Sequence, residues 1–280
     1  MDRTMREDSK HKLISFLCGI LIAAILCLQF PGITVEAKTK TKTSAKAKAK
    51  TKAKTKAKTT LILGDSIAYG MALGKRYGTG VDNPDKVYWL AEGGVTINFI
   101  HPNFKIHLGR KMPRKVVNTL TNTRNFDLIK EVKKKKIEDI VVVLGANWPG
   151  KDAAKLTVSC LKKLAKKSGC RVYYVNILPY VHKGRYKDKS GLMLQHNNVA
   201  REGFKNSGIV YIDAYSVAKS VKNYRNYTWD GIHYSGKVHN PVYKEILSVI
   251  EKNKNNTVLL TKKKAKKKKQ TDRLSNVLKD

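Results

Sequence analysis

Short apolar runs alternate with helix-like segments through most of this 280-residue chain. The clearest run lies at the end of the segment Ile137–Leu144. This run is continuously apolar, as is typical of a strand buried on both faces of a parallel sheet. Four other runs predict strands: Leu61–Leu63, Val87–Leu90, Arg171–Leu178 and Ile209–Ile212. Helical patterns follow Ser66 and cover Asp152–Lys167, Leu192–Phe204 and Asn240–Lys252. This alternation predicts the α/β class, with a mainly parallel five-stranded sheet covered by helices on both faces.

The two ends of the chain have a different composition. The formal net charge is +36, and ten lysines lie between Lys38 and Lys58 and seven more in Lys262–Lys269. Such runs repel themselves and bury no apolar surface, so they predict a disordered linker over 38–59 and a disordered tail over 257–280. The folded domain is expected at 60–256. Two separate basic segments favour adhesion to an anionic cell-wall polymer or membrane surface over a soluble spacer.

The N-terminus predicts export. A charged start, Met1–Lys12, precedes the apolar run Leu13–Phe30, and Val35-Glu36-Ala37 offers small residues where signal peptidase needs them. This is the pattern of a signal peptide over 1–37, cleaved after Ala37. An uncleaved membrane anchor is the alternative, because the run is near the shortest length that spans a bilayer. Either form places the domain outside the cytoplasm, secreted or at the cell surface. The apolar run also holds two cysteines, Cys18 and Cys27.

Neither a metal nor another cofactor is expected. Cys160 and Cys170 are open to a disulfide in an oxidising compartment, but their placement favours two separate small apolar side chains. His101 and His107 lie in a basic stretch, and an ordinary surface role is favoured over metal binding for both. Nucleic-acid binding is not expected either. The chain is predicted to be exported, and its basic segments are lysine runs without interleaved aromatic residues.

Glycine-rich or polar motifs follow the ends of several predicted strands. They are Gly64-Asp65-Ser66, Gly93-Gly94, Gly145-Ala146-Asn147 and the segment from Asp230 to His233. In open parallel α/β sheets, functional groups gather at the carboxyl ends of the strands. The four motifs are therefore expected to lie close together in the folded chain.

Three of these residues have the chemistry of a nucleophilic triad. The hydroxyl of Ser66 needs a base to take its proton, and His233 can accept a proton near neutral pH. Asp230, three residues before His233, can hold the imidazole in one tautomer and stabilise the imidazolium. His239 is the alternative base, without an aspartate three residues before it, and Asp213 is the alternative acid.

An oxyanion formed on the substrate needs hydrogen-bond donors. The backbone N–H groups of Ser66 and Gly94 and the side-chain amide of Asn147 are the candidates. Tyr69 and Trp148 lie beside these motifs in the sequence, and either lining of an acyl or sugar pocket or packing in the core fits them.

The four motifs resemble the conserved blocks of the SGNH hydrolases, also called GDSL esterases and lipases. Gly64-Asp65-Ser66-Ile67 resembles the serine block, with isoleucine in place of the usual leucine. The glycine block falls on Gly93 or Gly94, and Gly94 is favoured because Val95-Thr96 continues in the usual style. Asn147 corresponds to the asparagine of a Gly-x-Asn-Asp block in which Trp148 replaces the aspartate. The segment Asp230–Ser235 resembles the last block. The resemblance covers about Leu61–Lys252.

This resemblance implies a flavodoxin-like three-layer α/β/α domain and a Ser-His-Asp mechanism. Together with the export signal, it predicts an extracellular esterase that removes small acyl groups, acetyl foremost, from a carbohydrate or cell-wall polymer. Two alternatives remain open. One is a non-catalytic protein that binds anionic polymers on a hydrolase scaffold, and the other is an acyltransferase.

Overall fold

The computed structural model describes residues 58–74, 78–109, 115–182, 186 and 188–255. The predicted signal peptide, the C-terminal tail and nearly all of the linker lie outside these residues, as do Cys18 and Cys27. No helix within the described ranges combines the length and the apolar character that crossing a membrane requires.

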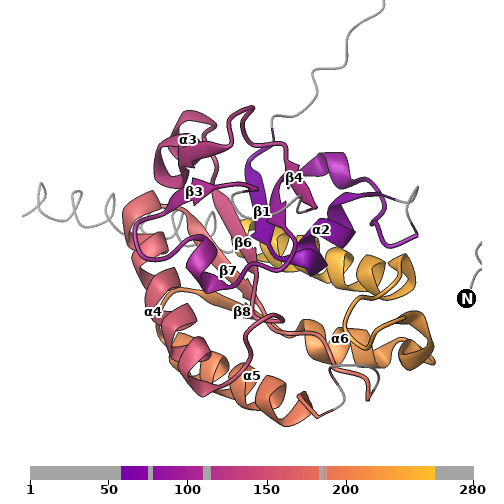
Figure 1. Cartoon of the computed structure of the whole chain (residues 1–280). Helices are drawn as coiled ribbons and strands as arrows, with labels where there is room; N and C mark the ends of the chain where they lie inside the picture. The colour runs from indigo at the N-terminus through magenta and orange to yellow at the C-terminus, as the bar shows by residue number, and fades with distance from the viewer. Residues whose placement is uncertain (1–57, 75–77, 110–114, 183–185, 187, 256–280) are drawn as a thin grey trace, which may run out of the picture. The chain divides into compact units, whose positions relative to one another are not determined.

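A six-stranded sheet forms the centre of the domain, with the order β4-β2-β1-β6-β7-β8 (Figure 1). All neighbouring pairs are parallel except β2 and β4, which are antiparallel. The bounds are β1 Thr60–Gly64, β2 Tyr88–Glu92, β4 Val116–Asn118, β6 Asp139–Val143, β7 Arg171–Val175 and β8 Val210–Ile212. The five predicted strands are the five parallel ones. The fold class is confirmed, and β4 adds a sixth strand at the edge.

The sixth strand was not predicted because β4 has little of the pattern of a buried strand. Its three residues are all half-buried, and it lies in the polar, basic stretch between β2 and α3. The same stretch contains a two-stranded antiparallel sheet, made of β3 (Lys105–His107) and β5 (Asn125–Asp127). Strands of three residues are too short for an alternating pattern to mark them in a sequence.

Helices cover both faces of the central sheet, as the three-layer prediction required (Figure 1). One face packs against α2 (Ser66–Ala72), α6 (Ala214–Ser220) and a last helix over 236–255. The other face packs against α3 (Leu128–Lys134), α4 (Lys151–Ser168) and α5 (Ser190–Phe204). The side chains of β1 alternate between the two layers, with Leu61 and Leu63 on one side and Ile62 on the other. Burial on both faces explains the continuously apolar runs of the sequence.

The strand order reverses at β1, whose two neighbours β2 and β6 continue the sheet in opposite directions. In doubly wound sheets, the helix after one of the strands at such a point goes to one face and the helix after its neighbour goes to the other. The loops therefore diverge, and a crevice opens at the carboxyl ends of the strands. Here α2 follows β1 on one face, and α4 follows β6 on the other. The predicted serine and asparagine motifs follow these two strands.

Candidate active site

The turn that carries Ser66 depends on a close approach of two strands. A Cβ atom on Gly64 would lie 2.2 Å from the carbonyl oxygen of Val143, so only glycine fits at the end of β1. Asp65 then caps α2, because its Oδ1 accepts a hydrogen bond from the Ile67 N–H at 2.9 Å. Ser66 is the first residue of the helix and is half-buried. The cap therefore fixes the backbone on both sides of the hydroxyl.

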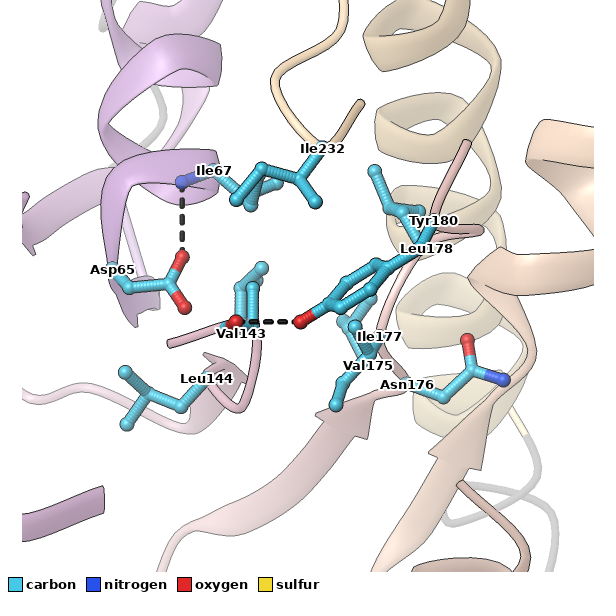
Figure 2. Close-up of a pocket in the computed structure, with 11 residues that line it drawn as sticks. Asp65, Ile67, Val143, Leu144, Val175, Asn176, Ile177, Leu178, Tyr180 and Ile232 are labelled. Carbon is cyan, nitrogen blue, oxygen red and sulfur yellow. Dashed lines mark hydrogen bonds between the residues drawn. The ribbon is translucent and has the colours of Figure 1, made fainter. Parts of the chain in front are cut away.

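The Asp65 carboxyl group is 1% exposed and faces a small apolar cavity beneath this turn (Figure 2). Burial raises its pKa to about 7, although backbone N–H groups of Ile67, Ala146 and Gly145 act in the opposite direction. Tyr180 lies in the same cavity, and its hydroxyl donates a hydrogen bond to the Ala146 carbonyl (Figure 2). The serine turn and the loop after β6 are thus held by one buried set of groups.

A tight loop near the C-terminal end of the domain's sequence carries His233. Its two ends form an isolated antiparallel bridge between Thr228 and Tyr234. The Tyr234 hydroxyl donates to the Pro179 carbonyl at 2.8 Å, and the Gly231 carbonyl accepts from the Val181 N–H at 2.9 Å. The segment after β7 therefore anchors this loop. Because Tyr234 is fully buried, the neighbouring His233 has little freedom to move.

The structure brings the three predicted triad residues into one chain of hydrogen bonds. The Oγ of Ser66 lies 2.8 Å from the Nε2 of His233, and the Nδ1 of His233 lies 2.6 Å from the Oδ2 of Asp230. A carboxylate can only accept, so Nδ1 carries the proton and Nε2 is left to accept from the serine hydroxyl. This is the tautomer that a general base for Ser66 needs.

Asp230 is held in its ionised form. Partial burial favours the neutral carboxyl, but hydrogen bonds from the His233 backbone N–H, the His233 ring and the Ile232 N–H outweigh it. The pKa of Asp230 is therefore lowered. Its Oδ1 accepts from the two backbone N–H groups at 2.9 and 3.1 Å, which leaves Oδ2 directed at the imidazole.

The two alternative residues occupy other positions. His239 is 1% exposed, its Nδ1 donates to the Thr79 carbonyl at 2.7 Å, and burial lowers its pKa to about 4. Asp213 caps α6 and accepts hydrogen bonds from Asn176 and Ser216. Neither contact involves the Ser66–His233 pair, so the geometry favours His233 as base and Asp230 as acid.

The two other predicted oxyanion donors lie on loops after β2 and β6. Gly94 has φ +77°, a left-handed conformation that favours glycine, whereas Gly93 does not. The backbone at Gly94 thus needs a glycine, which supports Gly94 over Gly93 as the glycine of the second motif. The side-chain amide of Asn147 donates to the carbonyl of Val95 at 2.9 Å. This bond ties the asparagine loop to the glycine loop and leaves the second amide hydrogen of Asn147 for another acceptor.

A cleft of about 330 Å³ opens beside the serine. Its lining residues are Ser66, Tyr69, Gly70, Leu73, Thr79, Lys115, Trp229, Asp230, His233, Tyr234 and His239. Tyr69 lines this cleft and also packs against the core, whereas Trp148 is 42% exposed and does not line the cleft. Trp229 was missed in the sequence, although its position directly before Asp230 was a usable signal.

The remaining sequence expectations concern cysteines and histidines. Cys160 and Cys170 are free thiols, the first buried and the second half-buried. His107 forms a hydrogen bond with Asn125 across the β3–β5 pair, at 3.1 Å. Within the part of the chain that the structure describes, no group of three or more His, Cys, Asp or Glu residues is arranged to hold a metal ion.

Comparison with solved structures places this geometry on a known fold. A structure of a Bacteroides fragilis protein named as an acylhydrolase matches with a TM-score of 0.51 and 18% identity, over 70% of this chain and 88% of that one. The chain shares the fold of this acylhydrolase. A GDSL-like lipase from Bacteroides thetaiotaomicron matches with a TM-score of 0.49 and 17% identity, over 70% of this chain and 89% of that one.

An acetyl xylan esterase also matches, with a TM-score of 0.45 and 16% identity, over 68% of this chain and 99% of that one. No protein-family model matches the chain, and no curated protein matches it. At 18% identity, the likeness to the first of these structures establishes a shared fold. Function has to be argued from the site itself.

Proposed function

We propose that this chain is an exported serine esterase that removes small acyl groups, acetyl foremost, from a carbohydrate or cell-wall polymer. The observation that supports it most is the 2.8 Å contact between Ser66 and His233, residues that lie 167 positions apart in the sequence. His233 in turn meets a carboxylate whose pKa is lowered, at 2.6 Å. A surface hydrogen bond would not need this complete series of a hydroxyl, an oriented imidazole and an ionised acid.

In the first half of the reaction, the Ser66 Oγ attacks the carbonyl carbon of the ester while its proton passes to the His233 Nε2. Asp230 stabilises the imidazolium that forms. The negative charge that develops on the carbonyl oxygen is stabilised by the N–H groups of Ser66 and Gly94 and by the Asn147 amide. His233 then gives its proton to the leaving alcohol oxygen, and the acyl group remains as an ester on Ser66.

In the second half, a water molecule attacks this acyl ester, and His233 takes a proton from the water. Collapse of the second tetrahedral intermediate releases the carboxylic acid and returns the proton to Ser66. A sugar hydroxyl in place of the water would receive the acyl group instead. The same residues therefore support acyl transfer as the second candidate, and the acceptor decides between the two.

The preference for a small acyl group rests on the size and lining of the cleft. A volume of about 330 Å³ lies at the low end for ligand sites. Polar side chains, among them Thr79, Lys115 and His239, share its walls with Tyr69 and Leu73. Because these polar groups interrupt the apolar part of the wall, a short acyl group is expected to fit it better than a long one.

Hydrolysis of p-nitrophenyl esters from acetate to octanoate tests this proposal, with Ser66→Ala beside the wild type. We expect the acetate ester to be cleaved fastest and Ser66→Ala to lose nearly all activity. A preference for octanoate would contradict the acyl-size assignment. Equal rates for the two proteins, or no activity in either, would instead favour the non-catalytic binding scaffold.

A further inference from the structure

Trp229 is the most exposed large hydrophobic side chain of the part that the structure describes, with 60% of its surface accessible. It lies in the wall of the Ser66 cleft. Its ring is stacked on the ring of His233, with centroids 5.6 Å apart and planes inclined by 12°. One face of the indole thus lies against the imidazole, while most of the residue's surface stays accessible.

The backbone holds this tryptophan in place. Thr228 before it is buried and pairs with Tyr234 in the isolated bridge, and its hydroxyl accepts from the Gly231 N–H at 2.9 Å. Next to the bridge, the Ser235 N–H donates to the Tyr227 carbonyl at 2.7 Å. Because the loop is closed on both sides, the exposed ring is preorganised and loses little conformational entropy when a ligand covers it.

From this arrangement we propose that Trp229 is a binding platform for a sugar ring of the substrate, and that it sets the preference for sugar esters. The inference rests on the proposed esterase function. A pyranose ring has C–H groups on its faces and hydroxyl groups at its edge, so it can cover an indole without burying unpaired hydroxyls. A ring seated there lies in the same cleft as Ser66, within which an acyl group on a ring oxygen is presented to the nucleophile.

The lining of the cleft fits such a ligand. Lys115 and Thr79 share the cleft with Trp229 and can hydrogen-bond to hydroxyl groups at the edge of the sugar. Tyr69 adds a second aromatic side chain to the same walls. Aromatic surface with a few polar groups around it is the usual composition of a site that binds a small polar ring.

A second role for Trp229 has to be separated from this one. Since the ring lies on His233, it is also placed to hold the imidazole in position. Loss of that support would slow every ester by the same factor. Loss of a sugar platform would slow sugar esters more than esters without a ring. The informative quantity is therefore the ratio of kcat/KM for two substrates, not either rate alone.

The experiment compares wild type, Trp229→Ala and Trp229→Phe on O-acetylated xylotriose, ethyl acetate and p-nitrophenyl acetate. Leu194→Ala is the matched control, because Leu194 is an exposed apolar residue that does not line the cleft. For Trp229→Ala we expect the ratio of kcat/KM for the sugar ester over ethyl acetate to fall about tenfold, mainly through KM. Trp229→Phe should recover part of the ratio, and Leu194→Ala should keep it.

An unchanged ratio in Trp229→Ala would overturn the platform, whether both rates fall together or neither changes. A fall confined to p-nitrophenyl acetate would also overturn it, because the ring would then select aromatic groups. Failure of the esterase proposal itself looks different. In that case the wild type would cleave none of the three esters faster than Ser66→Ala does.

Discussion

At the scale of single residues, the site depends on two carboxyl groups whose environments drive their pKa values in opposite directions. Asp65 is enclosed by apolar side chains, and its pKa rises to about 7. Asp230 receives three hydrogen bonds from its own loop, and its pKa falls. Only the second carboxyl group meets the imidazole, so only Asp230 is placed to stabilise its positive charge.

Replacing Asp230 by asparagine tests this division of roles. The variant keeps the size of the side chain but loses the charge and can hold the wrong tautomer of His233. We expect kcat for p-nitrophenyl acetate to fall by a factor on the order of 10⁴. Asp213→Asn is the matched control, because Asp213 caps α6 and asparagine caps helices equally well. A larger loss of kcat in Asp213→Asn than in Asp230→Asn would contradict the assignment of Asp230 as the acid.

The raised pKa of Asp65 predicts a dependence of stability on pH. Between pH 3.8, the usual pKa of an aspartate, and about pH 7, the folded state keeps the proton that the unfolded state has lost. The free energy of unfolding therefore falls across this range as pH rises. Asp65→Asn removes that fall and keeps an oxygen to cap α2, so the variant should gain about 3 kcal/mol relative to wild type between pH 4 and pH 7.

Urea denaturation of both proteins at several pH values measures this difference. His196 and His239 act in the opposite sense, because burial lowers the pKa of each to about 4. The unfolded state loses these protons as pH rises towards 6.5, so the free energy of unfolding rises over that range. Their contribution is common to both proteins and cancels in the difference. Parallel stability curves for the two proteins would contradict the account of Asp65.

At the scale of elements, the first turn of α2 and the loop that carries Asp230 and His233 bring the proposed catalytic groups together. The loop with His233 is tied to the segment after β7 through the Tyr234 hydroxyl. Tyr234→Phe removes that bond and leaves the Pro179 carbonyl without this donor. We expect a loss of about 1 kcal/mol in the free energy of unfolding and a several-fold lower kcat, because His233 is then less well positioned.

Tyr243→Phe is the matched control for this prediction. Tyr243 lies on the last helix, is also buried, and donates to the Asn83 carbonyl at 3.4 Å. The Tyr243→Phe variant should lower the free energy of unfolding without lowering kcat. If the two variants lower kcat equally, the loop anchor has no specific role in positioning the base.

The same scale shows what the sequence could and could not reveal. Four of the five parallel strands are almost fully buried, and β8 at the edge is partly buried, so their apolar runs predict them directly. The short helices α3 and α6 were not predicted, for a physical reason. The seven residues of α3 and of α6 span about two turns, too few for a clear period, although Asp127 and Asp213 cap them. The motifs after the strands predicted the three residues of the triad. The stacking of Trp229 on His233 depends on tertiary geometry, which the spacing of residues in the sequence does not reveal.

At the scale of the whole molecule, the proposal joins a site for sugar esters to basic segments outside the described domain. If these segments bind an anionic polymer, a chain over 38–280 should bind immobilised lipoteichoic acid more tightly than one over 58–256. The difference should shrink as salt is raised from 50 to about 500 mM, because it arises from charge. Equal binding of the two chains would remove the adhesion role from the basic segments.

The most direct test of the central claim is covalent labelling of the chain from Lys38 with a fluorophosphonate, followed by peptide mapping. A serine activated by its own base reacts with this reagent, whereas an ordinary hydroxyl does not. We predict labelling at Ser66 and a large loss of labelling in His233→Ala, with the His239→Gln variant still labelled. Absence of label on Ser66 in the folded wild type, or equal labelling in His233→Ala, would contradict the catalytic account.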